Sequence, residues 1–73
     1  MRLDGEKIRR TRELSGLTKC GAAQKAGISD TSWGRAEAGL SMSPPNALRV
    51  ARALSMDLAD LVPAESEREL QRA

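Results

Sequence analysis

Histidine, tyrosine and phenylalanine are absent from this chain of 73 residues, and Cys20 and Trp33 are its only cysteine and tryptophan. A lone cysteine excludes an internal disulfide, and without histidine it falls far short of the ligand set of a zinc site. The same absences remove the usual general base and the Cys–His pair of nucleophilic catalysis. No glycine-rich phosphate loop or paired carboxylates accompany the acidic residues. The composition therefore argues against an enzyme, and we expect no cofactor, no metal site and no small-molecule substrate.

Long apolar runs are also missing from the sequence. No run approaches the roughly 18 residues that a membrane-spanning helix needs, and no basic head with an apolar stretch behind it resembles a signal peptide. We therefore expect a cytoplasmic protein without a membrane partner. Because 40% of the residues are apolar, the chain should be globular. A single domain this small buries little surface, so a helical bundle with local contacts is its simplest stable fold.

The net charge of +2 is unevenly distributed along the chain. Residues 1–56 hold ten Lys and Arg against five Asp and Glu, whereas residues 57–73 hold two against five. A basic body favours a polyanionic partner, while the acidic end favours solvation or a protein partner.

The stretch 18–39, TKCGAAQKAGISDTSWGRAEAG, has the pattern of two short helices joined by a tight turn. Gly27 ends the first helix, because glycine adopts the left-handed conformation that terminates helices. Ser29 is a good N-cap for the second helix. Trp33 and Ala36 lie three residues apart and should therefore face inward together. The outward side then carries Asp30, Thr31 and Arg35.

Start and stop signals extend this pattern over most of the chain. Gly16 stops a first helix, Pro44 suits the first position of a fourth, and Pro63 ends a fifth. The sequence predicts an all-α fold with helices near 5–15, 18–26, 29–38, 44–54 and 57–62. We expect one domain over residues 1–62 and an acidic tail over residues 63–73.

The core of this bundle should consist of small and aliphatic side chains around Trp33. Ile8 is the clearest buried residue of the first helix. Further candidates there are Leu3, Thr11, Leu14 and Leu17. The buried side of the fourth helix is predicted to hold Ala47, Leu48, Val50, Ala51 and Leu54, with Arg49 and Arg52 on its polar side.

Together these residues resemble the lambda-repressor-like (XRE, Cro-like) helix-turn-helix family. The matching positions are Ala23, Gly27, Ile28, Trp33, Ala36, Glu37 and Gly39. The flanking segments GEKIRRTREL and ALRVARALSMDLADLV are similar to the family's first helix and to its fourth and fifth, so that residues 5–62 are covered. The resemblance implies a five-helix domain with the helix-turn-helix at helices two and three, and double-stranded DNA as the partner.

The resemblance also implies an ion pair between the first and third helices. Members of this family often pair an arginine of the first helix with the glutamate that ends the recognition helix, and the matching residues are Arg12 and Glu37. A partly buried, bonded pair would align the two helices. The alternative is a solvated pair worth about 0–1 kcal/mol.

The DNA contacts implied for this chain lie on the second and third helices, in the loop after the third helix and at the start of the fourth. They comprise Thr18, Lys19, Ser29, Asp30, Thr31, Arg35, Ser41 and Asn46. Lys19 replaces the family's usual glutamine and suits a phosphate contact. Arg35 suits guanine through its paired donors. Asp30 either accepts a hydrogen bond from a cytosine amino group or simply favours the start of the helix.

Two residues of the third helix have a second interpretation. Trp33 could stack on a base, as aromatic residues of single-strand binders do, but its spacing to Ala36 and Ile28 favours the core. Gly34 either permits close approach to a groove wall or only lowers the stability of the helix.

The function that we infer is a sequence-specific double-stranded DNA-binding transcriptional regulator of the repressor type, phage Cro-like or controller-like. It would act as a homodimer on a two-fold-related operator. The candidate dimer contacts on the fifth helix are Leu58, Leu61 and Val62. The alternative is an antitoxin or protein-interaction module with the same fold, which the acidic tail and Asp30 favour and the basic body disfavours.

Overall fold

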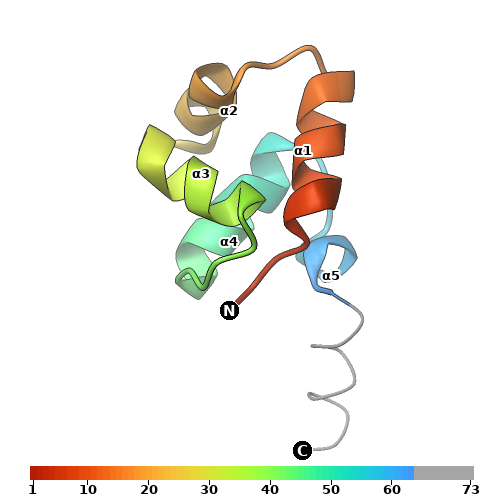
Figure 1. Ribbon diagram of the computed structural model, residues 1–73, viewed down its shortest axis with the longest axis vertical. Helices are drawn as coiled ribbons and strands as arrows, with labels where there is room; N and C mark the ends of the chain where they lie inside the picture. The colour runs from red at the N-terminus through yellow and green to blue at the C-terminus, as the bar shows by residue number, and fades with distance from the viewer. Residues whose placement is uncertain (64–73) are drawn as a thin grey trace, which may run out of the picture.

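Five α-helices make up the computed structural model over residues 1–63, the part of the chain that the structure describes (Figure 1). They are α1 (Gly5–Leu14), α2 (Lys19–Ala26), α3 (Asp30–Glu37), α4 (Pro44–Ala53) and α5 (Leu58–Leu61). Within these residues there is no strand, and no helix is long and apolar enough to cross a membrane. The predicted all-α fold is confirmed, and each helix begins and ends within one residue of its predicted range. The predicted acidic tail lies outside the described residues, except for Pro63.

Polar side chains fix where most of the helices begin. The N-caps that accept a side-chain hydrogen bond are Asp4, Thr18, Ser29 and Ser43, and the donors are the backbone N–H groups of Lys7, Gly21, Ser32 and Asn46. Each such cap contributes about 1 kcal/mol. Asp57 occupies the N-cap position of α5, but its side chain makes no cap hydrogen bond. Gly27 ends α2 with φ = 74°, the left-handed conformation expected of it.

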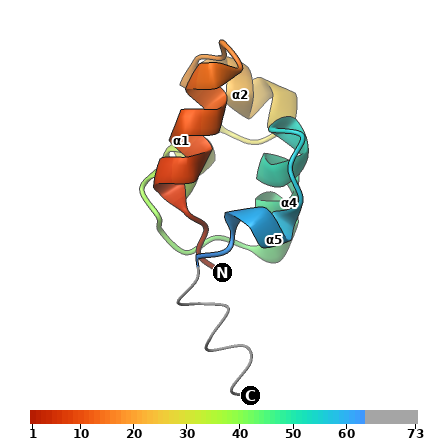
Figure 2. The same cartoon turned by 90° about the vertical axis from the view of Figure 1, so that its right-hand side faces the viewer.

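The helices pack so that α2 and α3 form one corner of the molecule. α3 contacts α1, α2 and α4, and α4 also contacts α2 and α5. Figure 2 shows α1 on one side of the bundle and α4 with α5 on the other. Two backbone hydrogen bonds connect the segment before α1 to distant parts of the chain. The Met42 N–H donates to the Met1 carbonyl at 2.8 Å, and the Asp4 N–H donates to the Leu61 carbonyl at 2.6 Å.

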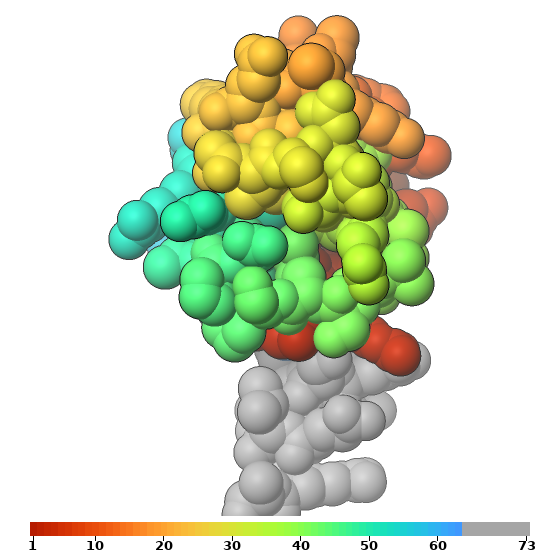
Figure 3. Space-filling view, turned by 90° about the vertical axis from the view of Figure 1, so that its left-hand side faces the viewer, coloured from red at the N-terminus to blue at the C-terminus, as the bar shows by residue number. Residues whose placement is uncertain are grey.

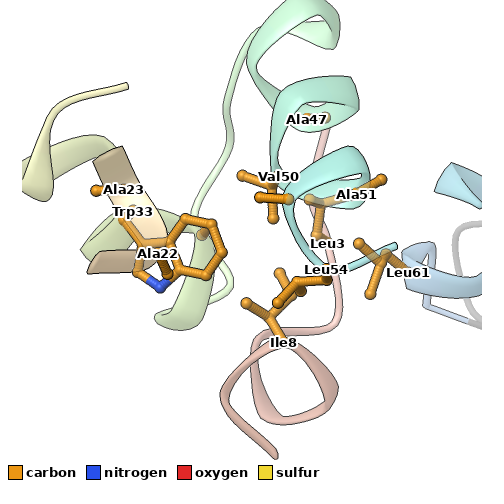
Figure 4. Close-up of a cluster of buried hydrophobic side chains, with 12 residues drawn as sticks. Leu3, Ile8, Ala22, Ala23, Trp33, Ala47, Val50, Ala51, Leu54 and Leu61 are labelled. Carbon is orange, nitrogen blue, oxygen red and sulfur yellow. The ribbon is translucent and has the colours of Figure 1, made fainter. Parts of the chain in front are cut away.

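Trp33 is the largest side chain of the core and is fully buried, as predicted (Figure 4). The other buried apolar residues are Leu3, Ile8, Ala22, Ala23, Ala36, Ala47, Val50, Ala51, Ala53, Leu54 and Leu61. Six of these eleven residues are alanines, so Trp33 supplies a large share of the apolar volume of the core.

Three predicted burial assignments differ from the structure. Leu14 is 83% exposed and Leu48 is 40% exposed. Leu14 follows the buried Arg12 by two residues, a rotation of about 200° that turns it away from the core. Leu48 lies beside the stripe through Ala47 and Val50 that α4 buries. Leu61 is fully buried in its own domain, so its predicted role as a dimer contact is wrong.

Gly5 allows the start of α1 to lie directly against the end of α3. A Cβ atom at this position would stand 2.0 Å from the Glu37 carbonyl oxygen and 2.6 Å from its carbon. Both atoms belong to the backbone and cannot move aside as a flexible side chain can. The contact between α1 and α3 therefore depends on the missing side chain of Gly5.

Candidate nucleic-acid interface

Helix α3 divides into an inner side that anchors it and an outer side that is open to solvent. Trp33 and Ala36 are buried, whereas Asp30, Thr31 and Arg35 are exposed. Figure 3 views the molecule from the α3 side and shows α3 in yellow-green between α2 and the start of α4. The exposed residues are those that the sequence placed on the outward side. They can approach a ligand without disturbing the core.

Glu37 anchors the C-terminal end of α3. Arg12 Nε donates to Glu37 Oε2 at 2.8 Å, and Arg12 Nη2 donates to Oε1 at 3.4 Å. Trp33 Nε1 also donates to Oε2, at 2.5 Å. The remaining terminal nitrogen of Arg12 donates to the Leu17 carbonyl at 2.9 Å. The Arg12 and Glu37 side chains are only 10% and 6% exposed, so the pair is internal and not a solvated pair at the surface.

This cluster ties three parts of the chain together. Arg12 belongs to α1, Leu17 to the loop before α2, and Glu37 to α3. Every buried side-chain nitrogen and oxygen atom in residues 1–63 has a hydrogen-bond partner. The two opposite charges therefore compensate each other in the low-dielectric interior. The cluster lies on the inner side of α3 and thus fixes the helix without using its outer residues. The bond from Trp33 was not predicted, although its spacing of four residues from Glu37 places both on one side of the helix.

Two predicted contact residues already use their hydroxyl groups as helix caps. Thr18 Oγ1 accepts from the Gly21 N–H at 3.0 Å, which leaves its hydroxyl proton available to a phosphate. Ser29 Oγ accepts from the Ser32 N–H at 3.1 Å and donates to Ser32 Oγ at 3.0 Å. Its proton is therefore occupied in this structure. Of the two, Thr18 is the better placed to donate to DNA.

A shallow hollow of about 270 Å³ lies between the outer side of α3 and the start of α4. Its lining residues are Ser32, Arg35, Ser41, Met42, Ser43 and Asn46. The hollow brings together Arg35, Ser41 and Asn46, three of the predicted contact residues. Ser32 was missed, although it precedes Arg35 by three residues and so shares its side of the helix.

The remaining predicted residues lie at the starts of two helices. Thr18 and Lys19 begin α2, while Ser29, Asp30 and Thr31 begin α3. Lys19 is exposed and forms no ion pair with any residue in the described range. Backbone N–H groups at such helix starts point outward and favour anions. The interface thus combines two helix starts with a polar hollow, and the exposed carboxylate of Asp30 places one negative charge at the start of α3.

Comparisons with known proteins identify the helix-turn-helix arrangement of the fold. Residues 5–64 match the family model described as a helix-turn-helix domain. Among solved structures, the chain is similar to the master regulator for biofilm formation SinR in complex with DNA, with a TM-score of 0.68 and 21% identity over 75% of this chain and 90% of that chain. It is equally similar to a SinR protein/SinI protein complex, over 92% of this chain and 74% of that chain. At this identity the likeness shows the shared fold. No match was found among curated proteins.

Proposed function

The chain belongs to the helix-turn-helix domain family, and we propose that it is a sequence-specific double-stranded DNA-binding transcriptional regulator of the repressor type. One observation carries the proposal. The inner side of α3 is fixed by Trp33 and by the Arg12–Glu37 pair, while its outer side presents Asp30, Thr31 and Arg35 to solvent. A helix held in this way can enter a major groove as a rigid body.

The parts of the interface have different proposed roles. Arg35 reads a guanine, since its guanidinium can donate two parallel hydrogen bonds to O6 and N7. Thr31 and Asp30 lie one turn earlier and contact neighbouring bases. Lys19 and Thr18 hold a phosphate at the start of α2, while Ser41 and Asn46 hold a second one at the hollow. Ser29 mainly keeps its place as the cap of α3.

We further propose that the protein acts in the cytoplasm as a homodimer on a two-fold-related operator. Residues 1–62 form its DNA-binding unit. A domain of this size gains a doubled binding site and buried apolar area by pairing. Because Leu61 belongs to the core, the proposed dimer contacts are reduced to Leu58 on α5 and Val62 at its C-cap, both partly exposed.

The alternative function is an antitoxin or another protein-interaction module. Asp30 favours it, because an exposed carboxylate at the start of α3 repels phosphates. The basic residues of the body, including Lys19 and Arg35, favour DNA.

Selection of bound duplexes from a random-sequence pool separates the two functions. A regulator enriches a common two-fold-related sequence and then binds it at least a thousandfold more tightly than a scrambled duplex of equal composition. An interaction module enriches no sequence. The selected duplex and the scrambled duplex of equal composition then serve as a matched pair of binding probes.

A further inference from the structure

Arg49 lies on α4, which the interface described above uses only at its first residues. Its Nη1 donates to the Gly27 carbonyl at 3.5 Å, in the turn between α2 and α3. Arg49 is exposed, and no carboxylate among the described residues lies within ion-pair distance of it. A guanidinium has five N–H donors, and this weak bond engages only one of its nitrogens. The remaining donors therefore stay open to a ligand.

The bond also sets where this charge stands. Gly27 precedes the cap Ser29 by two residues, a path of at most about 7 Å, so the guanidinium stands beside the start of α3. A recognition helix contacts base edges with its first residues. The B-DNA major groove is about 12 Å wide, and an α-helix with side chains nearly fills it. A cation beside the start of the helix therefore faces the phosphates at the groove edge.

The charge of α3 itself gives a second reason for a cation at this place. The first turn of α3 contains the acidic residue Asp30 and no basic residue, since Arg35 lies in the last turn. Without a nearby cation, the end of the helix that enters the groove would present a negative side chain to DNA. Arg49, brought in from α4, supplies the opposite charge.

We propose that Arg49 contacts a DNA phosphate beside the start of the recognition helix, a contact that rests on the DNA-binding function proposed above. The contact is independent of sequence, because a phosphate is present at every step of the duplex. It adds a third point of backbone attachment to those at Lys19 and at the hollow. The weak bond to the Gly27 carbonyl orients Arg49 toward the α2–α3 turn before DNA binds.

The test compares the wild-type chain with Arg49→Ala and Arg49→Lys on the selected and scrambled duplexes at several salt concentrations. Arg49→Ala should weaken binding to both duplexes by about fivefold at 0.15 M salt and reduce the slope of log affinity against log salt by about 0.9. Arg49→Lys keeps the charge and should keep the slope. Arg9→Ala is the matched control. It removes the same charge from α1, where Arg9 stands 3.8 Å from Glu13, and should leave the slope unchanged.

Three possible results would overturn the proposed phosphate contact. An Arg49→Ala slope equal to that of the wild type overturns the phosphate contact. A loss confined to the selected duplex, with an unchanged slope, also overturns it and shows that Arg49 only holds the turn. A wild-type chain that binds neither duplex overturns the proposed function and this contact with it. Thermal melting checks that the variants remain folded.

Discussion

The indole of Trp33 and the carboxylate of Glu37 lie one helical turn apart on α3 and are joined by a hydrogen bond of 2.5 Å. The same carboxylate oxygen accepts from Arg12 of α1. The bulkiest side chain of the core therefore shares its polar partner with the ion pair that links α1 to α3. Packing and charge compensation thus act on one position, and both hold α3 from its inner side.

Loss of the Glu37 carboxylate should be among the most destabilising single changes in this domain. Glu37→Ala leaves the Arg12 guanidinium buried without its counter-charge and should lower the free energy of unfolding by about 3–5 kcal/mol. Urea denaturation measures this change. Glu13→Ala is the control, because Glu13 is 60% exposed and stands 3.8 Å from the same arginine. Its cost should stay below about 1 kcal/mol. Equal costs for the two variants would contradict the buried role of Glu37.

Trp33 should act in the core and not as a base-stacking residue. Trp33→Ala removes a fully buried indole and should cost about 3–5 kcal/mol, enough to unfold a domain of this size. Trp33→Phe retains most of the ring but no N–H group, and should cost about 1–3 kcal/mol because the Glu37 carboxylate loses a donor. Circular dichroism with thermal melting reports both. A Trp33→Ala variant that stays folded and loses only DNA binding would restore the stacking interpretation.

Two glycines should respond to alanine with opposite signs. Gly5→Ala places a Cβ atom 2.0 Å from the Glu37 carbonyl oxygen and should cost about 1–3 kcal/mol through overpacking. Gly34 lies within α3, and a Cβ atom there would have no neighbour within 4 Å apart from the nearby backbone of the helix itself. Gly34→Ala should therefore stabilise the domain by about 0.5–1 kcal/mol. Paired urea titrations measure the difference. Stabilisation by both substitutions would show that α1 and α3 do not lie in direct contact at Gly5.

The features that the sequence predicted well depend on local interactions. Ser29 caps α3 by accepting a hydrogen bond from the backbone N–H three residues ahead, so its role can be recognised from a few neighbouring residues in the sequence. The same holds for Gly27 at the end of α2. The outward position of Arg35 follows from helical periodicity once Trp33 is placed in the core.

The features that the sequence missed depend on contacts between distant segments. Leu14 is apolar and helical, yet it is 83% exposed and no other helix of residues 1–63 covers it. Nothing in its local sequence distinguishes it from the buried Ile8. Leu61 has an apolar pattern that suits either a core or an interface. The need for glycine at position 5 arises from the backbone of Glu37, and the position of Arg49 arises from the turn at Gly27. Such pairings require the three-dimensional fold.

Two protomers should occupy one operator. The proposed pairing through α5 places two recognition helices in successive major grooves, so the half-sites should be centred about 34–36 Å apart, one turn of the duplex. Sedimentation equilibrium on the selected duplex should give two chains per duplex, and on a half-site duplex it should give one. One chain on the full site would rule out the homodimer. Binding that is equally tight to both duplexes would show that the two chains do not cooperate.

Arg35 should contact a base edge and so recognise the DNA sequence, whereas Lys19 should contact a DNA phosphate. Arg35 is exposed, lies one turn beyond Thr31 and lines the hollow beside α3. Arg35→Ala should weaken binding to the selected duplex by about 1–3 kcal/mol and flatten the preference at one base pair. Lys19→Ala is the matched comparison, because it also removes one positive charge. It should weaken binding to the selected and scrambled duplexes by similar factors and reduce the salt slope by about 0.9.

Titrations of both variants on single-base-pair substitutions of the selected duplex distinguish these two roles. If a side chain contacts a base, its removal abolishes the preference only at that base pair, because other side chains recognise the other positions. Loss of a phosphate contact lowers the affinity for every duplex by the same factor, so the relative preference among base pairs stays unchanged. If Arg35→Ala lowers the profile uniformly, Arg35 is a backbone contact. Base recognition must then come from Thr31 and Asp30, the other exposed residues on the outer side of α3.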